Sequence, residues 1–443
     1  MAYRFVRWIF TAGLSLFYRW HLLEGAIPAQ GPLVIVGNHP NALIDPVAVM
    51  RLTGRPVRFL AKAPIFKMPV LGGLVRLMRC LPVYRKQDDP SQMGKNDDTF
   101  KAAHQALAAG EAICIFPEGR SHSDPALSPL KTGAARIALG AEREKGFGLG
   151  VRFVPVGFVY RQKGIFRSEV AVAVGPPIPV ADLDGAHAAD PVAAGHQLTE
   201  RIDAALHQVT LNLDTWDDLP LVEAASRLYR AERGTGADLR PFAQGLGALR
   251  ARDPDQLQRI RRRVLVLDGT LRALRLPADD LDRVRPLRAV RFAGVHLARG
   301  VLGGVPALLG ILAYGVPYQL IRAVAHFTAR EADVTASVKL GVGVLLMPAW
   351  TLGLLVAGWR LGGAAGLVVA LVLPACGLFA LSFLESMSAA LANARAFLAL
   401  RAHGGLRQRL LTRRKAVVEA LEQLGQDVGV LGEAAAPNPA QLA

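Results

Sequence analysis

The sequence predicts an α/β domain with a mostly buried mixed sheet, followed by a helical region and a membrane-embedded α-helical C-terminal part. Three observations lead to this fold class. Short β-rich runs alternate with helical stretches in the first half of the chain, a polar stretch rich in arginine and leucine follows at 216–285, and three long apolar runs come next. The chain of 443 residues is long enough to form two or three such units.

The composition indicates a membrane protein. Hydrophobic residues make up 51 % of the chain, and the formal net charge of +16 suits nucleic acid, anionic lipid or an anionic substrate. Because the apolar runs favour the last two, we expect a lipid bilayer as partner and no nucleic acid. The three cysteines form no CxxC pair, so we expect neither a disulfide framework nor a metal site, and an active site that faces a reducing compartment.

Residues 1–24 are expected to form an interfacial amphipathic helix. Arg4, Arg7 and Arg19 stand among aromatic residues there, and the uncharged run Trp8–Tyr18 has 11 residues, too few to span a bilayer. A helix of this kind lies on a membrane surface. A core helix packed through its aromatic side chains is the alternative, and a cleaved signal peptide is less favoured.

Residues 25–215 are expected to form the α/β domain. Its β-rich runs are Leu33–Gly37, Val57–Leu60, Ala112–Phe116, Phe153–Val159 and Val170–Val174. Helical stretches lie between them, for example at 97–109 and 132–144, and a helix at 199–211 closes the domain. This alternation is typical of a sheet covered by helices.

Residues 216–290 are expected to form a helical linker region. Arginines cluster at 259–263, either on a solvated face or on a basic patch that faces lipid. After the apolar runs, residues 386–443 predict a basic amphipathic tail that rests on an anionic cytoplasmic leaflet, with a frayed end at 433–443.

Residues 291–385 are expected to form the transmembrane region. The uncharged runs Val301–Ile321, Leu340–Trp359 and Leu361–Leu384 contain 21, 20 and 24 residues, enough for a hydrocarbon core of about 30 Å. Arg360 and the glycines after it predict a hairpin between the last two runs. The arginines at 283–299, before the first run, and the basic tail after the last run both predict that their own segment lies on the cytoplasmic side. Three full spans would place these two segments on opposite sides of the membrane. Two full spans and one half-inserted segment fit better.

The first motif with chemical meaning follows the strand predicted at 33–37. It contains His39 and, six residues later, Asp45. A histidine with a nearby carboxylate is a general base whose partner holds one tautomer and stabilises the imidazolium that forms. No nucleophilic Ser or Cys accompanies the pair, so the base would activate a substrate hydroxyl directly. A surface loop with a capping Asp is the alternative.

A second motif, at 115–121, again follows a predicted strand. Gly119 would let the backbone approach an anion, and Arg120 is a residue type that binds phosphate through two hydrogen bonds. Glu118 would either hold Arg120 or bind a substrate hydroxyl. A turn with a surface salt bridge explains this motif equally well when it stands alone. Among the other histidines, only His122 beside this motif is a candidate for a role.

Two further stretches suggest contacts with a lipid substrate. Lys62, Lys67 and Arg85 stand among apolar residues and would form a cationic rim on an apolar groove, unless the lysines simply extend from a core helix. Pro155 and Val156 belong to an apolar strand that would line an acyl channel, or to a plain edge strand.

In their order and spacing, these four motifs resemble the four sequence blocks of the glycerolipid acyltransferases over about residues 20–210. That family includes glycerol-3-phosphate and lysophosphatidic acid acyltransferases. The resemblance implies that His39 and Asp45 are catalytic. It also implies that Arg85 binds substrate at the end of the second block in chain order, which is the stretch that contains Lys62 and Lys67. It also implies that Glu118, Gly119 and Arg120 lie near the phosphate and that the fourth block is the strand around Pro155.

One feature departs from the common form of this family. Five residues separate His39 from Asp45, where the common form has four. The longer spacing, the sequence at 116–133 and the position of the membrane segments resemble the branch with the fungal glycerol-3-phosphate and dihydroxyacetone-phosphate acyltransferases. This resemblance adds Lys131 as a phosphate-binding candidate, just before a predicted helix whose N-terminus favours anions.

The resemblance implies a membrane-bound O-acyltransferase without a cofactor. It would transfer a fatty acyl group from acyl-CoA or acyl carrier protein to the sn-1 hydroxyl of glycerol 3-phosphate or dihydroxyacetone phosphate, from an active site that faces the cytoplasm. The alternatives are 1-acyl-glycerol 3-phosphate (lysophosphatidic acid) acylated at sn-2, or another lysolipid. A non-catalytic lipid-binding membrane protein would not need the motif residues together, and a transporter would carry ionisable residues inside its apolar runs.

Overall fold

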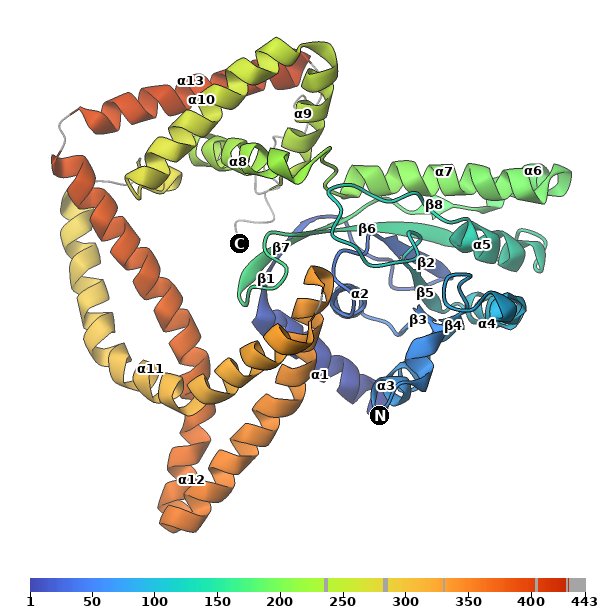
Figure 1. Ribbon diagram of the computed structural model, residues 1–443, viewed down its shortest axis with the longest axis horizontal. Coiled ribbons are helices and arrows are strands. Elements are labelled where there is room, and N and C mark those ends of the chain that lie inside the picture. Colours follow the sequence, from blue (N-terminus) through green and yellow to red (C-terminus); the bar gives the residue numbers. More distant parts are fainter. Residues whose placement is uncertain (235–237, 282–285, 330, 403–404, 428, 430–443) are drawn as a thin grey trace. The chain divides into compact units, whose positions relative to one another are not determined.

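The computed structural model describes residues 1–443 with the exception of 235–237, 282–285, 330, 403–404, 428 and 430–443 (Figure 1). The chain forms two compact units, 1–212 with 324–344 and 213–323 with 345–443. The side chains at 283–299 and the end of the tail at 433–443 lie outside what the structure describes. The orientation and the fraying inferred from them therefore stay predictions.

The first unit is built on one eight-stranded sheet with the order β1-β7-β6-β2-β5-β3-β4 and with β8 beside β6 (Figure 1). The strands are β1 (Tyr18–Glu24), β2 (Leu33–Gly37), β3 (Val57–Lys62), β4 (Leu81–Val83), β5 (Ala112–Ile115), β6 (Arg152–Tyr160), β7 (Ser168–Val174) and β8 (Ile178–Pro179). Strand β6 is antiparallel to β7 and β8, and the other pairs are parallel. The predicted mixed α/β sheet is confirmed.

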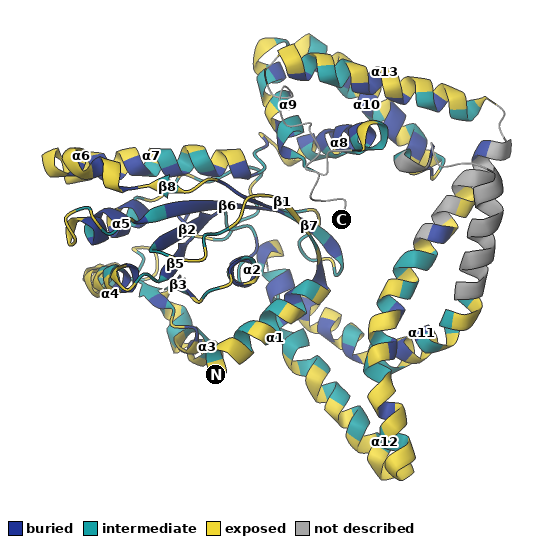
Figure 2. Ribbon diagram, turned by 180° about the vertical axis from the view of Figure 1, so that it is seen from behind, coloured by how far each residue is buried: buried dark blue, intermediate teal, exposed yellow. Residues whose placement is uncertain are grey.

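Alternate side chains of the central strands enter two hydrophobic cores, one on each face of the sheet. In β2, Val34 and Val36 belong to the first core, and Leu33 and Ile35 to the second. All four are fully buried, as the dark strands in Figure 2 show. Because both faces are covered, β2 is a continuous apolar run rather than an alternating one.

Helices cover both faces of the sheet. The first core is covered by α4 (Asn96–Ala108), α5 (Gly133–Arg143) and α7 (Pro191–Val209), and the second by α1 (Ala2–Phe17), α2 (Ile44–Leu52) and the start of α12 (Ala332–Ala402). Shorter elements are η1 (Ala63–Lys67), α3 (Leu71–Leu77), η2 (Pro90–Lys95), η3 (Ala181–Leu183) and α6 (Asp184–Ala189). The side chain of Asp190 caps α7 by accepting hydrogen bonds from the first turn, where Pro191 occupies a position that needs no N–H donor.

The N-terminal helix is shorter than the sequence suggests. It ends at Phe17, and residues 18–24 form the edge strand β1, paired in parallel with β7, so the expectation of a helix through residue 24 is wrong. Leu14 and Phe17 are buried in the second core, whereas Phe5 and Trp8 are 60 and 65 % exposed. One side of α1 therefore packs in the core. Its other side presents the exposed aromatic residues that an interfacial helix requires.

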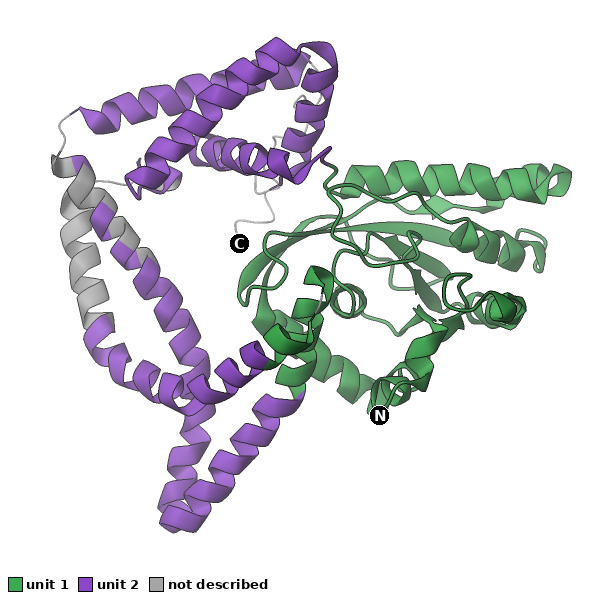
Figure 3. Cartoon of the chain, viewed as in Figure 1, with its two compact units in different colours: residues 1–212, 324–344 green, residues 213–323, 345–443 purple. Residues whose placement is uncertain are grey.

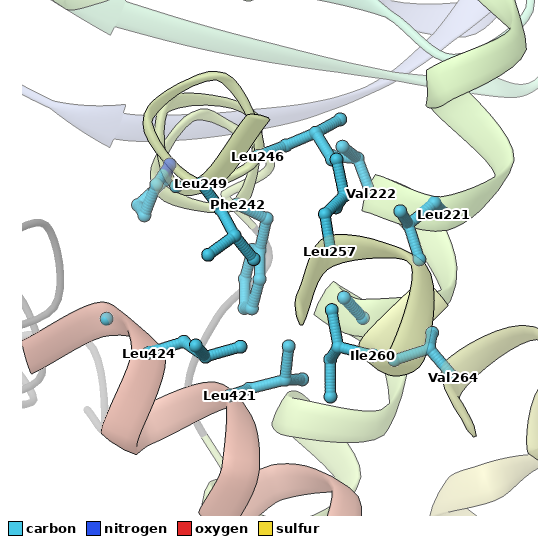
Figure 4. A pocket seen from close by; sticks show the side chains of 14 residues that line it. Leu221, Val222, Phe242, Leu246, Leu249, Leu257, Ile260, Val264, Leu421 and Leu424 are labelled. Atoms are coloured by element: carbon cyan, nitrogen blue, oxygen red, sulfur yellow. The ribbon is translucent and has the colours of Figure 1, made fainter. Parts of the chain in front are cut away.

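The second unit contains the helices predicted between residues 216 and 285 (Figure 3). They are η4 (Trp216–Asp218), α8 (Leu219–Arg233), α9 (Arg240–Arg252), α10 (Pro254–Ala273) and η5 (Ala278–Leu281), and α13 (Leu406–Asp427) packs with them. An apolar pocket of about 60 Å³ lies between α8, α9, α10 and α13, lined by side chains such as Phe242, Leu257 and Leu421 (Figure 4).

Part of the tail predicted to be basic and amphipathic faces inward. Arg414 in α13 is only 2 % exposed and donates to Glu232 in α8 at 2.7 Å. A buried arginine needs such a partner, because an unpaired charge is costly away from water. Arg414 is thus part of the helical unit and not of a surface that rests on a leaflet, which corrects the expectation for this residue.

Among the described residues, two helices are long and apolar enough to cross a membrane by length and composition, at Gly300–Thr328 within α11 (Pro286–Thr328) and at Ala332–Ser388 within α12. The second is interrupted at Gly363, which has φ 57° and ψ −139°. Gly358 and Gly366 approach closely across this break, since a Cβ atom at Gly358 would lie 2.6 Å from the Gly366 carbonyl oxygen. The hairpin predicted after Arg360 is confirmed.

Close packing of α7 against β6 gives a prediction about stability. A Cβ atom at Gly157 in β6 would lie 1.7 Å from the carbonyl oxygen of Val209, whereas a Cβ atom at Gly195 in α7 would meet nothing within 4 Å. We expect Gly157→Ala to lower the free energy of unfolding by about 1–3 kcal/mol or more, because the backbone must move apart. Gly195→Ala should leave stability unchanged or raise it by up to about 1 kcal/mol.

The measurement is thermal unfolding of the full chain in detergent, followed by intrinsic fluorescence. Equal unfolding midpoints for the two variants would contradict the packing described for β6.

Candidate active site

The two predicted catalytic residues meet where β2 ends. His39 lies in the loop after β2, and Asp45 lies in the first turn of α2. The Nδ1 atom of His39 is 2.9 Å from Oδ2 of Asp45. The loop between them includes Ala42, whose φ is 25°. The spacing of five residues is therefore compatible with a direct hydrogen bond.

Neighbouring strands fix the place of His39. The Asn38 side chain donates to the Phe158 carbonyl at 3.0 Å and accepts from the Phe158 N–H at 2.8 Å, so it continues the pairing of β2 with β6 by one more step. The imidazole ring stacks on Phe116 with a centroid distance of 4.1 Å and an angle of 9°. The position of the ring is thus set by the ends of β2, β5 and β6.

The Asp45 carboxylate is fully buried and receives two hydrogen bonds besides the one from His39. The backbone N–H of Asn41 and the hydroxyl of Tyr160 each donate to it at 2.7 Å. Burial, followed by the negative charge of Asp45, raises the pKa of Tyr160 well above its ordinary value, so the hydroxyl stays a donor. Sequence analysis did not single out Tyr160, although it lies five residues after Pro155, at the end of the strand predicted as the fourth block.

These contacts select one tautomer of His39. Because Nδ1 donates to the carboxylate, Nε2 carries the lone pair. The side chain is 18 % exposed, and none of the residues that the structure describes forms a hydrogen bond with Nε2. The arrangement therefore leaves a basic nitrogen at the surface of the unit, ready to accept a proton.

Glu118 connects the second motif to His39. Its buried carboxylate accepts hydrogen bonds from the backbone N–H groups of His39 at 3.0 Å and Ser128 at 2.7 Å, and it pairs with the His122 ring. The backbone N–H of His122 in turn donates to the His39 carbonyl at 3.1 Å. Glu118 thus holds the loop of the second motif against the loop that carries His39, and His122 takes part in this contact.

Two of the predicted phosphate-binding cations meet at Gly119. The Arg85 guanidinium donates to the Gly119 carbonyl at 3.1 Å. Gly119 has φ 75°, and a Cβ atom there would lie 2.5 Å from Nζ of Lys131, so the ammonium group lies directly against it. Glycine at this position lets both cations approach the backbone.

The pKa of Asp88 reports the positive charge that gathers near Gly119. Asp88 accepts two hydrogen bonds from Arg85, each of 2.7 Å. The pKa of Asp88 lies below its ordinary value because of this contact and because of the nearby charges of Lys62 and Lys131. The charge of Lys62 therefore acts on the same carboxylate, that of Asp88, as the charges of Arg85 and Lys131.

The structure does not bring the other two predicted cations to this cluster. Arg120 is 59 % exposed at its side chain and pairs with Asp124 at 2.9 Å, not with Glu118. Lys67 is exposed in η1, and its charge acts on Asp89. The assignment of Arg120 stays a prediction from the resemblance, and that of Lys67 stays a prediction from the apolar residues around it.

The two residues predicted for an acyl channel lie in the sheet. Val156 belongs to the second core, where its carbonyl oxygen would lie 3.0 Å from a Cβ atom at Gly37. Pro155 faces the other side of β6 and packs beside Gly175. Successive residues of a strand point to opposite faces, so one channel along a single face would not be lined by both side chains.

Two cysteines of the first unit, Cys80 and Cys114, have thiols with raised pKa values. Burial raises the pKa of Cys80 to about 11 and that of Cys114 well above its ordinary value, so both thiols stay protonated near neutral pH. Over the part of the chain that is described, no group of three or more His, Cys, Asp or Glu side chains has the arrangement of a metal site. The described residues of the site thus place the His39–Asp45 pair beside a cationic cluster.

Comparisons with known proteins show similarity to acyltransferases. A family model described as acyltransferase matches residues 23–159. Glycerol-3-phosphate O-acyltransferase 2 of Saccharomyces cerevisiae is 36 % identical over 30 % of this chain and 18 % of its own length, and glycerol-3-phosphate O-acyltransferase 1 of the same yeast is 24 % identical over 76 and 57 %. A chloroplastic 1-acyl-sn-glycerol-3-phosphate acyltransferase of Brassica napus is 32 % identical over 26 and 32 %.

Among solved structures, the 1-acyl-sn-glycerophosphate acyltransferase of Thermotoga maritima is similar to 40 % of this chain and 68 % of its own, with 20 % identity and a TM-score of 0.31. The chain spans less than two thirds of the length of the curated relatives named above. The matched segment contains β2, the His39–Asp45 pair, Arg85 and Glu118. Residues 23–159 match the acyltransferase family model, and this part of the chain is similar to glycerol-3-phosphate O-acyltransferases.

Proposed function

We propose that this protein is a membrane-bound O-acyltransferase that transfers a fatty acyl group from a thioester to the sn-1 hydroxyl of glycerol 3-phosphate. The observation that carries the proposal is the His39–Asp45 pair, whose free Nε2 atom lies in the same two-loop site as the cations at Gly119. Glu118 joins these two features, because it accepts from the His39 backbone and directly precedes Gly119. A general base beside a phosphate-binding cluster suits an acceptor that carries both a hydroxyl and a phosphate.

The proposed reaction needs no covalent intermediate on the enzyme. Nε2 of His39 removes the proton from the acceptor hydroxyl, and the oxygen attacks the carbonyl carbon of the thioester. Asp45 stabilises the imidazolium that forms, and Tyr160 and Asn41 keep the carboxylate in place. As the tetrahedral intermediate collapses, the carbon–sulfur bond breaks and the leaving thiolate takes the proton from Nε2. The products are the ester and the free thiol of the carrier.

The cation cluster would hold the acceptor phosphate. Arg85 and Lys131 lie at Gly119, and Lys62 adds its charge at Asp88. Arginine binds phosphate through two parallel hydrogen bonds, as it binds Asp88 in the structure. An incoming phosphate would take the place that the Asp88 carboxylate occupies on the guanidinium. Dihydroxyacetone phosphate presents the same two groups and is included in this proposal.

A second acceptor remains a candidate because a relative of similar identity is named for it. The Brassica napus protein is a 1-acyl-sn-glycerol-3-phosphate acyltransferase, which implies an acceptor with the same phosphate and a free sn-2 hydroxyl. The yeast relatives are named for glycerol 3-phosphate, and one of them matches over 76 % of this chain. We therefore propose the unacylated acceptor first. We further propose acyl-CoA or acyl carrier protein as donor and an active site that faces the cytoplasm.

The acceptor and the base are tested together. The full chain in lipid vesicles is supplied with palmitoyl-CoA and, separately, with glycerol 3-phosphate or 1-acyl-glycerol 3-phosphate. We expect product from glycerol 3-phosphate, and a loss of kcat of at least about 10²-fold in His39→Ala, because a general base contributes roughly 10²–10⁴-fold. His207→Ala is the matched control, since His207 is exposed and pairs only within its own helix.

Product from 1-acyl-glycerol 3-phosphate alone would keep the role of His39 and replace the acceptor. Full activity of His39→Ala with either acceptor would overturn the proposed mechanism.

The hydrogen bond from Tyr160 to Asp45 gives a second kinetic prediction. Tyr160→Phe removes one donor from a buried carboxylate and leaves the His39–Asp45 contact in place. A hydrogen bond to a charged group contributes about 1.5–3 kcal/mol, so we expect kcat to fall by about tenfold or more with little change in KM. Tyr229→Phe is the control, because it removes a hydroxyl that meets Glu422 in the helical unit. An unchanged kcat in Tyr160→Phe would show that Asp45 does not depend on this donor.

The cation cluster gives a third kinetic prediction, because Arg85 and Arg120 lie in different surroundings. We expect Arg85→Gln to raise KM for glycerol 3-phosphate by at least about tenfold, as a charge-assisted pair to phosphate is lost. Arg120→Gln should change KM by no more than about threefold, because this side chain is exposed and pairs with Asp124. The KM values of both variants are measured from initial rates at varied concentrations of glycerol 3-phosphate. A larger effect at Arg120 would place the phosphate outside the cluster at Gly119.

A further inference from the structure

The beginning of α12 contacts both loops of the proposed site. The Ser121 hydroxyl donates to the carboxylate of Asp333, and the backbone N–H of Leu43 donates to the Ser337 hydroxyl at 3.0 Å. Ser121 belongs to the loop of the second motif, and Leu43 lies between His39 and Asp45. A segment about two hundred residues later in the chain therefore reaches the loops that carry the base and its phosphate-binding neighbours.

These residues are an integral part of the first unit. Asp333 is 4 % exposed and Ser337 is 9 % exposed, while Ala336 and Leu340 pack in the second core. Lys339 adds a hydrogen bond to the carbonyl of Gly164 at 2.6 Å. The segment is thus buried against the catalytic loops before the helix continues into its apolar part.

The path from Asp333 to the base is short. Ser121 directly precedes His122, whose backbone N–H donates to the His39 carbonyl at 3.1 Å and whose ring pairs with Glu118. Glu118 accepts from the backbone N–H of His39. Both polar groups of the His39 backbone are therefore held by the loop that Asp333 holds.

The role of Asp333 goes beyond that of an ordinary acidic residue at a helix start. An aspartate in the first turn favours a helix through its interaction with the N-terminal dipole, but an exposed side chain does this equally well. Asp333 is buried instead, which costs free energy unless the carboxylate gains specific partners.

We propose that Asp333 and Ser337 are positioning residues of the acyl-transfer site, which hold the loop of the second motif and the His39 loop in register. The inference rests on the proposed function of His39. It makes the first turns of α12 a part of the catalytic unit, although they lie outside the matched domain at 23–159. The helix that enters the apolar hairpin would then also set the geometry of the reaction.

The test compares kinetic constants of variants of the full chain in vesicles, with palmitoyl-CoA and glycerol 3-phosphate. Asp333→Ala is expected to lower kcat by about 10–100-fold with KM nearly unchanged, because small displacements of a base act on the transition state. Asp333→Asn keeps an oxygen that accepts from Ser121, and it should restore kcat to within about threefold of the wild type. Ser121→Ala should reproduce the loss, and the double variant Ser121→Ala/Asp333→Ala should lose no more than either single variant.

Two matched controls come from the same segment. Glu331→Gln changes an exposed carboxylate just before α12, and Thr335→Ala removes a hydroxyl that donates to the Glu331 carbonyl. Both should keep kcat within about twofold. If Asp333→Ala does not fold, Ser121→Ala and Ser337→Ala, which each remove a single hydroxyl, carry the test, and each should lower kcat by about tenfold.

The outcomes separate this inference from the proposed function. A wild-type kcat in Asp333→Ala or in both serine variants, or losses that multiply in the double variant, would overturn the positioning role while an inactive His39→Ala upheld the proposed function. Full activity in His39→Ala would overturn both.

Discussion

The site depends on one requirement, the satisfaction of a buried carboxylate. Asp45 has no exposed surface, and an ionised group in that position is tolerated only when donors surround it. The three donors come from two parts of the chain, namely His39 and Asn41 in the loop after β2 and Tyr160 at the end of β6. Each donor fixes the segment that supplies it. The orientation of the His39 ring is therefore a consequence of burying its partner.

The sequence allowed prediction of those features whose signals are local. Strand β2 is an uninterrupted apolar run, and His39 and Asp45 follow it within a few residues, so both the strand and the pair could be recognised. The hairpin at Gly363 was visible in the same way. Tyr160 and Asp333 could not be found, because their roles arise from contacts with residues far away in the chain. Strand β1 was missed because its aromatic residues continue the apolar run of α1, and only its pairing with β7 distinguishes it.

Residue type alone did not show which cations gather around Gly119. Arg85, Arg120 and Lys131 all belong to the matching motifs, yet Arg120 extends away and pairs with Asp124. The positive φ of Gly119 and the absence of a side chain there let Lys131 and Arg85 approach the same backbone. The arginines of the tail are likewise a poor guide to its surface charge, since Arg414 pairs with Glu232 inside the helical unit.

The catalytic unit is discontinuous in the chain, and this affects how it can be made. Its first part ends at residue 212, and its last part, 324–344, follows 111 residues of the other unit. At roughly 5–20 residues per second, a ribosome needs on the order of ten seconds to synthesise the intervening stretch. During that time the sheet has emerged while the second core still lacks Ala336 and Leu340. A nascent chain with an apolar face left open in this way is a natural client for chaperones until the segment arrives and closes it.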